Sequence, residues 1–355
     1  MPTTDEFVFV GCYTGESGGA GEGIALLRRE PGSGVLTRLG VIARTPSPSF
    51  LAAHPDRPVL YAVNEVDGGT VSAFAVAADG GLTPLAVRST GGAHPCHLAV
   101  AGGGRHLLAA NYTSGSVAVF PLGADGVPGD RSDLLSLAGQ GPVADRQEGP
   151  HAHMVAPEDF TADVLVVDLG ADRVARLRVD PVTGRLLEGE PAVLAEPGTG
   201  PRHLVRAPDG ALLLVGELAA NLTWYRRDPG DGRLRPEGSV ATSAGPGHVQ
   251  PSEIVMGHDG RFVYVANRGV DTVSAFSWGG EGATRVAEVP SGGEWPRHMV
   301  MAGGHLYVAN ERSHTVSTFR IDPESGFPHP QGEPTREPSP TCLLRWKPNI
   351  AAERR

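Results

Sequence analysis

The chain has 355 residues, of which 40% are hydrophobic, and it carries a formal net charge of −10 with no basic run. An acidic chain without a basic patch has no electrostatic attraction to nucleic acid or to anionic membrane, so neither is an expected partner. The 49 glycines and 31 prolines are many for a chain that can bury a core, and they indicate short strands joined by turns.

The N-terminal segment and the cysteines bear on the cellular compartment. Residues 1–6 (MPTTDE) are not a positive segment followed by an apolar run, and no stretch approaches the ~18 apolar residues that a membrane-spanning helix needs. Cys12, Cys96 and Cys342 are an odd number of cysteines with wide spacing, which argues against a disulfide framework or a structural zinc site. We therefore expect a cytoplasmic protein without a cofactor.

A short phrase recurs along the chain, and each copy opens a run that reads as a β-strand. It is clearest as Pro-Arg-His at residues 201–203 and again at 296–298. Seven copies of one phrase indicate a repeat architecture in which each copy opens one structural unit. The other five copies begin at Pro48, His94, His151, Pro251 and Pro340.

Each unit reads as four strands. The opening phrase leads to a turn, such as Asp-Gly at 209–210 or 259–260, and then to an apolar run that ends in a polar residue. A third strand with period-2 alternation follows, for example 70–76 (TVSAFAV), and a short fourth strand such as 82–87 (LTPLAV) ends the unit. Four antiparallel strands that meander in this way make one blade of a β-propeller.

The spacing of the units gives their number. The polar residues that end the second strands recur about every 50 residues, which is a propeller period. The first unit lacks its opening strand, whereas residues 340–346 (PTCLLRW) supply an extra one. We predict an all-β, seven-bladed propeller of four-stranded antiparallel blades, closed by N- and C-terminal strands that share a blade, over residues 1–346 with a tail at 347–355. The aligned polar residues are Cys12, Asn64, Asn111, Asp168, Glu217, Asn267 and Asn310.

The hairpin geometry of a blade brings two sets of side chains to one mouth of the ring. The innermost strand begins where the second strand ends, because the two strands run antiparallel. A long excursion at 123–149 and the Gly-rich turn at 15–23 (GESGGAGEG) also lie on this side, where loops commonly carry function. The opening phrases contribute His97, His151, His153, Arg202, His203, Glu253, Arg297 and His298. The second-strand ends contribute Glu65, Asn111, Glu217, Asn267 and Arg268.

These residue types fit chemistry on an anion. Arg202, Arg268 and Arg297 can each bind carboxylate or phosphate oxygens through two parallel hydrogen bonds. A histidine or a glutamate whose pKa is tuned by burial can transfer protons. The pair His151 and His153 is weak support for a metal site, because two histidines alone are too few ligands.

Structural roles compete with these functional ones. A histidine repeated at one point of the blade, as His97, His203 and His298 are, forms a structural ring when it hydrogen-bonds the backbone of the next blade. Salt bridges between blades, to Glu217 or Glu253, are the structural alternative for the arginines. The asparagines at the second-strand ends are typical turn residues.

Several phrases together resemble one known family, the lactonase family of seven-bladed propellers. The family includes the propeller-type 6-phosphogluconolactonases and the carboxy-cis,cis-muconate lactonizing enzymes. The resemblance covers roughly residues 7–346 and implies an enzyme with its active site in one mouth of the channel. The phrases are HPCHLAV with LLAANYTSGSVAVFPL, GPHAH, VVDLGADRV, GPRHLV, PSEI with DGRFVYVANRGVDTVSAF, and PRHM with LYVANE.

The resemblance also implies site residues. In the branch of the muconate lactonizing enzymes, a histidine, two arginines and a glutamate share the mouth. The matching positions are His151 or His153 of GPHAH, Arg202 of GPRH, Glu217 of GEL and Arg268 of ANRG, which we predict to be catalytic. The predicted substrate-binding residues are Glu65, His97, Asn111, Glu253 and Arg297.

The leading hypothesis is hydrolysis of a sugar-acid lactone, with 6-phosphogluconolactone as first candidate. Arginines would hold the phosphate and the oxyanion, and a histidine or Glu217 would activate water. The alternatives are cycloisomerisation of a muconate-type dicarboxylate and a non-catalytic propeller that binds a ligand at its rim. Seven repeats argue against a metal-dependent lactonase of the six-bladed type. We expect a small anionic metabolite as partner, and a monomer or weak homodimer.

Overall fold

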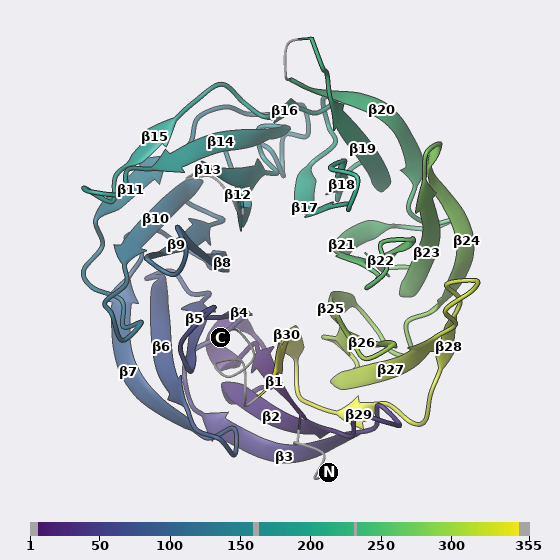
Figure 1. The fold of residues 1–355 in the computed structure, drawn as a ribbon, viewed down its shortest axis with the longest axis horizontal. Coiled ribbons are helices and arrows are strands. Elements are labelled where there is room, and N and C mark those ends of the chain that lie inside the picture. The colour runs from purple at the N-terminus through teal and green to yellow at the C-terminus, as the bar shows by residue number, and fades with distance from the viewer. Residues whose placement is uncertain (1–5, 159–162, 231–232, 348–355) are drawn as a thin grey trace.

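The computed structural model describes residues 6–158, 163–230 and 233–347, which form a ring of seven β-sheets around one axis (Figure 1). Each sheet is one blade, and its strands are ordered from the axis to the rim. The inner strands are β4 (Phe50–Ala53), β8 (Pro95–Ala101), β12 (Ala152–Pro157), β17 (Pro201–Arg206), β21 (Gln250–Met256), β25 (Pro296–Ala302) and β30 (Pro340–Trp346). The second strands, in the same blade order, are β5 (Val59–Asn64), β9 (His106–Asn111), β13 (Asp163–Asp168), β18 (Leu212–Gly216), β22 (Phe262–Arg268), β26 (His305–Asn310) and β1 (Glu6–Cys12).

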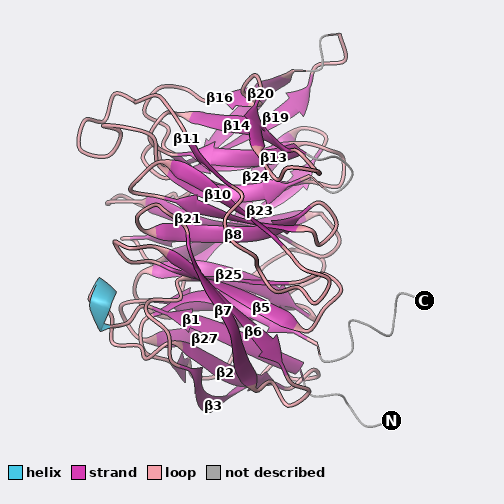
Figure 2. Ribbon diagram, turned by 90° about the vertical axis from the view of Figure 1, so that its left-hand side faces the viewer, coloured by secondary structure: helices cyan, strands magenta, loops and turns pink. Residues whose placement is uncertain are grey.

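The outer halves of the blades follow the same order. The third strands are β6 (Thr70–Val76), β10 (Ser116–Pro121), β14 (Arg173–Val179), β19 (Asn221–Arg227), β23 (Thr272–Gly279), β27 (Thr315–Ile321) and β2 (Ile24–Arg29). The outermost strands are β7 (Leu82–Ser89), β11 (Asp133–Ser136), β15 (Leu186–Glu188) with β16 (Val193–Leu194), β20 (Leu234–Ala241), β24 (Gly282–Pro290), β28 (Pro328–Pro330) with β29 (Thr335–Arg336), and β3 (Leu36–Ala43). Figure 2 shows the short 3-10 helix η1 (Gly15–Ser17) on the face of the ring where the second strands end.

The ring closes through a shared blade, as the sequence predicts. The C-terminal strand β30 is the innermost strand of the sheet β3-β2-β1-β30 and pairs with the N-terminal strand β1. The pairing runs from Phe7 with Trp346 to Cys12 with Pro340, so β1 has no free inner edge. The predicted seven-bladed propeller of antiparallel blades is confirmed, and two blades divide their outermost strand into short pieces (β15 with β16, and β28 with β29).

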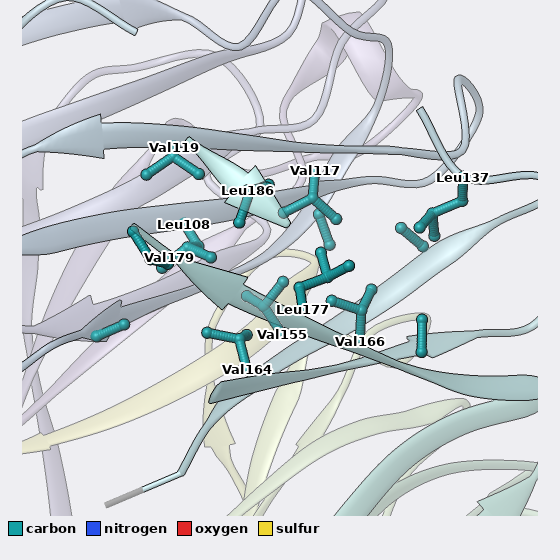
Figure 3. Packing of buried hydrophobic residues seen from close by; sticks show 14 residues of the cluster. Leu108, Val117, Val119, Leu137, Val155, Val164, Val166, Leu177, Val179 and Leu186 are labelled. Atoms are coloured by element: carbon teal, nitrogen blue, oxygen red, sulfur yellow. The ribbon is translucent and has the colours of Figure 1, made fainter. Parts of the chain in front are cut away.

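The core lies in the contacts between neighbouring blades. Second strands such as β5 (VLYAVN) are buried along their whole length, because adjacent blades cover both faces of each sheet. Figure 3 shows one contact, in which Val117 and Val119 of β10 pack with Val164 and Val166 of β13. Burial of each such side chain stabilises the fold by about 1.5–3 kcal/mol. The ends of the inner strands are therefore held by a rigid ring.

Part of the sequence interpretation of residues 123–149 is wrong. The sequence predicts one long excursion, but β11 (Asp133–Ser136) lies inside it and pairs with β10 as the outermost strand of its blade. Four residues with two leucines are too short a pattern to stand out as a strand. Only residues 137–149 remain as an inserted loop. The predicted tail at 347–355 lies almost entirely outside the described residues.

Candidate active site

A bulge near the start of five of the seven inner strands sets one residue of the phrase apart. In β17, Pro201 pairs with Gly216 and His203 pairs with Val215, so Arg202 has no partner across the ladder. The side chains of a β-strand alternate between the two faces of the sheet. An unpaired bulge residue interrupts this alternation, so its side chain points in a different direction. The sequence does not reveal this bulge, yet the bulge explains why the phrase carries a chemical side chain at that point. The equivalent unpaired residues are Cys96, His153, Arg297 and Thr341.

The residue after each second strand forms a second ring at the same end of the axis, which we call the mouth. The backbone N–H groups of Glu65, Tyr112, Glu217 and Glu311 each donate to a carbonyl just before an inner strand, at 2.8–3.1 Å. The sequence alignment that grouped Glu217 with the strand-end asparagines is therefore wrong by one residue. The strand β18 ends at Gly216. The alignment took the next residue, Glu217, as the strand end because that residue is polar.

Three arginines converge on the carboxylate of Glu217. Arg268 Nη2 donates to Glu217 Oε2 at 2.7 Å, and Arg146 Nη2 donates to Oε1 at 2.6 Å. Arg202 Nε lies 3.1 Å from Oε2 without the alignment of a hydrogen bond. Three guanidinium groups against one carboxylate leave two uncompensated positive charges. We call these four residues the arginine cluster.

Burial and mutual charge set the protonation of the arginine cluster. Burial alone raises the pKa of Glu217, but Arg268, Arg202 and Arg146 outweigh burial and bring this pKa to about 2. Burial, followed by the repulsion of Arg268, lowers the pKa of Arg202 to about 10. Both groups therefore stay ionised at neutral pH. A carboxyl group this acidic holds a proton only weakly.

Backbone carbonyls and one indole hold the two deepest arginines in place. Arg202 Nη1 donates to the carbonyl oxygen of Ser252, and Arg268 Nε donates to that of Gln250 at 3.2 Å. Both acceptor residues belong to β21. This strand is the inner strand of the next blade after the one that contains β17. The Arg268 guanidinium also lies 5.4 Å from the centroid of the Trp295 ring, a favourable cation–π distance. The site is thus built across the junction of two blades.

The two histidines of the GPHAH phrase differ in their surroundings. His151 stacks on Tyr112 at 4.5 Å between ring centroids, its Nδ1 lies 3.0 Å from the Tyr112 carbonyl oxygen, and its Nε2 lies 3.3 Å from Glu148 Oε1. His153 occupies the bulge position of β12, and its ring centroid lies 5.2 Å from that of His203. Its buried Nδ1 has no hydrogen-bond partner among the described residues. His151 thus has a neighbouring oxygen at each ring nitrogen, whereas Nδ1 of His153 has no partner among the described residues.

A ring of histidines lies next to the bulge residues and joins neighbouring blades. His97 Nδ1 and His298 Nδ1 each accept a backbone N–H from the next inner strand, at 3.4 Å and 3.2 Å. Glu253 lies between two of the histidines, with Oε1 3.0 Å from His203 Nδ1 and Oε2 3.2 Å from His298 Nε2. The structural alternative for these histidines is therefore confirmed for His97 and His298. Glu253, a predicted substrate-binding residue, contacts two histidines of the same series.

Acid pH is expected to destabilise the fold through this ring. Burial above all lowers the pKa of His97 and of His203 well below the ordinary value, and that of His298 to about 4. The unfolded chain takes up these protons near pH 6.5 and the folded chain does not, so the free energy of unfolding falls as the pH drops below about 6.5, by up to about 1.4 kcal/mol per pH unit for each histidine. Glu253 acts in the opposite sense, because burial raises its pKa. Urea unfolding at about pH 7.5 and about pH 5.5 measures the net loss.

The ring itself supplies a control for this prediction. Met154 Sδ accepts the backbone N–H of Leu204 at 3.3 Å, which is the contact that His97 makes with Val155 in another blade. His97→Met is therefore expected to keep the contact while it removes one titrating group. The stability difference between the two pH values should shrink in this variant. An unchanged difference would exclude His97 as a contributor.

Arg297 belongs to a second charged cluster at the mouth. Its Nη2 donates to Tyr13 Oη at 2.5 Å, its Nη1 donates to Glu311 Oε2 at 3.5 Å, and Glu65 Oε2 lies 3.9 Å away. Tyr13 Oη in turn donates to Glu65 Oε1 at 2.7 Å. Burial lowers the pKa of Arg297, but Tyr13, Glu311 and Glu65 reverse this effect and raise it overall. The structure thus brings the predicted binding residues Glu65 and Arg297 together.

The asparagines at the second-strand ends serve the backbone. Asn64 Nδ2 donates to the Pro46 carbonyl oxygen at 2.6 Å, and Asn267 and Asn310 make the same kind of contact. The turn role of this series is confirmed for these three residues. Asn111, a predicted substrate-binding residue, is fully buried and donates from Nδ2 to Ser116 within its own blade. The structure does not place it in either charged cluster.

Sequence reasoning missed two members of the site. Arg146 lies in the inserted loop 137–149, outside the repeat, so no alignment of blades could reveal it. Tyr13 follows β1 at the ring position of Glu65 and Glu311, and a register based on the residue after each second strand would have found it.

Among the described residues, no group of three or more His, Cys, Asp or Glu side chains is arranged to hold a metal ion. None of the described helices is long and apolar enough to cross a membrane.

Relatives match the chain over most of its length. A protein of Bacillus subtilis named 6-phosphogluconolactonase is 33% identical over 350 residues, which are 94% of this chain and 97% of that protein. One from Formosa agariphila with the same name is 28% identical over 90% of this chain and 93% of its own.

Solved structures also match this chain over nearly its whole length. A structure from Bacteroides fragilis is 30% identical and superposes with a TM-score of 0.90, covering 98% of this chain and 100% of that one. The periplasmic gluconolactonase of Pseudomonas aeruginosa is 29% identical with a TM-score of 0.87, covering 96% and 99% of the two chains. The family model described as "Lactonase, 7-bladed beta-propeller" matches residues 7–345. The chain therefore belongs to this lactonase family of seven-bladed β-propellers.

Proposed function

We propose that the protein hydrolyses 6-phosphogluconolactone. The observation that carries this proposal is the arginine cluster, whose two uncompensated positive charges lie where the inner strands begin. A phosphorylated lactone carries close to two negative charges at neutral pH, which match this excess. The names of the relatives from Bacillus subtilis and Formosa agariphila support the same substrate.

His153 is proposed as the general base. Burial, followed by the charge of Arg202, lowers the pKa of His153 well below its ordinary value, so its imidazole is neutral at pH 7. A neutral imidazole has one nitrogen that accepts a proton. In the proposed reaction this nitrogen takes a proton from water while the water oxygen bonds to the lactone carbonyl carbon. The imidazolium then returns the proton to the ring oxygen as the bond between that oxygen and the carbonyl carbon breaks.

Arg202 is proposed to stabilise the oxyanion of the tetrahedral intermediate. Arg202 and His153 occupy the same bulge position in neighbouring inner strands, so base and cation stand side by side on one ring. A fixed cation in a water-poor site stabilises a developing negative charge more than water does. Glu217, with a pKa of about 2, is then a positioning residue that holds the three arginines together against their mutual repulsion.

The test is an assay of the purified protein on two substrates. With 6-phosphogluconolactone, acid release is expected to exceed the spontaneous rate of ring opening. Carboxy-cis,cis-muconate is expected to keep its absorbance. Loss of that absorbance would instead support the cycloisomerase alternative. Failure to accelerate opening of the phosphorylated lactone would overturn the proposed function, and inactivity on both substrates would favour the non-catalytic alternative.

A cytoplasmic location is also proposed. Cys12, Cys96 and Cys342, the three cysteines of the chain, are buried and unpaired, as is common in a reducing compartment. The family is not confined to one compartment, since the Pseudomonas aeruginosa relative is described as periplasmic. Fractionation of cells that express the protein at its native level tests this point.

A further inference from the structure

We infer that Arg146 makes the site selective for a phosphorylated lactone over an unphosphorylated one. The inference rests on the proposed function and assigns it a specificity residue that no blade repeat contains. Three features of Arg146 carry it: its exposure, its unused donors and the rigidity of the loop that presents it.

Arg146 is the accessible member of the arginine cluster. Its side chain is 31% exposed, compared with 3% for Arg202 and 7% for Arg268. The two deeper guanidinium groups are bound to carbonyl oxygens of β21. A phosphate group that arrives from the mouth therefore meets Arg146 without displacing a backbone contact.

Arg146 also retains donors for a ligand. Both of its hydrogen bonds come from Nη2, to Glu217 Oε1 at 2.6 Å and to Tyr112 Oη at 3.4 Å. Its Nε and Nη1 groups make no hydrogen bond with the described residues. A guanidinium group offers five N–H donors in a planar fork that fits phosphate oxygens in pairs. Glu217 thus fixes one edge of the fork and leaves the other for an anion.

The loop that presents Arg146 is anchored rather than loose. Gln147 is fully buried, its Nε2 donates to the Leu169 carbonyl oxygen at 2.9 Å, and its Oε1 accepts the Val143 N–H at 3.2 Å. A side chain at Gly141 would collide with the Gln147 amide, which lies 2.4 Å from the ideal Cβ position. The buried glutamine therefore pins the loop to the blade of β13. A cation held this firmly loses little conformational entropy when it binds an anion.

The charge of the ligand decides how much Arg146 contributes to its binding. A sugar lactone without phosphate is neutral and gains at most a hydrogen bond to this residue, whereas a phosphate dianion gains a charge-assisted pair. The second cluster, with Glu65 and Glu311 beside Arg297, is better suited to sugar hydroxyl groups, because carboxylates accept hydrogen bonds from them. The phosphate is therefore assigned to the side of the mouth that Arg146 occupies.

The test compares two lactones in one variant. For Arg146→Gln, the ratio of kcat/KM for 6-phosphogluconolactone to that for glucono-δ-lactone is expected to fall about 10–100-fold, in the range of a lost charge-assisted hydrogen bond. The loss should appear mainly in KM. Binding of the product 6-phosphogluconate, measured by calorimetry, should weaken by a similar factor, and binding of gluconate should weaken much less.

Two further variants separate the possible outcomes. Gln147→Leu keeps Arg146 but frees its loop, and it should shift the same ratio in the same direction. Arg131→Ala removes an exposed arginine of the 123–149 region and should leave the ratio at the wild-type value. Equal losses on both lactones in Arg146→Gln would overturn the inference while the proposed function stands. Absence of wild-type activity on 6-phosphogluconolactone would defeat the proposed function itself.

Discussion

Replacement of His153 by glutamine is expected to lower kcat for lactone hydrolysis by about 10²–10⁴-fold, the usual contribution of a general base. Glutamine is close to histidine in size and polarity but cannot take a proton from water. His153 is also the histidine whose buried Nδ1 lacks a partner among the described residues. Steady-state rates on 6-phosphogluconolactone, corrected for spontaneous opening, measure the loss.

The pH profile provides a second measurement for the same variant. Burial and Arg202 keep the pKa of His153 well below its ordinary value, so the wild-type kcat should fall on the acid side, as the pH drops through that lowered pKa. In His153→Gln this acid limb should disappear. A general structural defect would lower the rate at every pH and keep the limb.

His151→Gln is the matched control, because His151 lies two residues away in the same phrase. Its ring nitrogens already contact the Tyr112 carbonyl oxygen and Glu148, so its replacement should cost less than about tenfold in kcat, well below a lost general base. A larger loss in His151→Gln than in His153→Gln would reverse the assignment of the base.

The fold could be predicted from the sequence because each blade repeats the same punctuation. The apolar second strands and the Asp-Gly turns mark each unit, and the extra phrase at 340–346 reveals the shared blade. Where the pattern is weak, the prediction fails: β11 (Asp133–Ser136) has only two apolar residues, so the sequence pattern predicts a loop in place of the outermost strand of this blade. Local pattern therefore sufficed for strands that are buried on both faces and not for a short strand at the rim.

The candidate site could be predicted only in part. The resemblance and the hairpin geometry both pointed to Arg202, Glu217 and Arg268, which the structure brings within hydrogen-bonding or ion-pair distance. The sequence could not show that Arg146 reaches the same carboxylate, because a loop outside the repeat delivers it. Nor could it separate His151 from His153, since their difference depends on a bulge and on which ring nitrogen has a partner.

Substitution of Glu217 by glutamine is expected to lower the free energy of unfolding by about 3–5 kcal/mol, the cost of leaving buried charges without their partner. The variant keeps the shape of the side chain but leaves Arg146, Arg202 and Arg268 close together without a carboxylate. Urea unfolding at neutral pH measures the loss. Glu237→Gln is a suitable control, because its exposed ion pair with Arg226 should contribute no more than about 1 kcal/mol.

An anion should reverse this destabilisation if the arginines are a binding site. In Glu217→Gln the three guanidinium groups have lost their internal counter-charge, so inorganic phosphate or 6-phosphogluconate should stabilise the variant more than the wild type. The gain is expected to grow with ligand concentration, because binding to the folded state alone stabilises it by mass action. If Glu217 were only a structural salt-bridge partner with no room for an anion beside it, phosphate would stabilise both proteins equally. Activity should stay low even when phosphate restores stability, since the added anion occupies the place of the substrate.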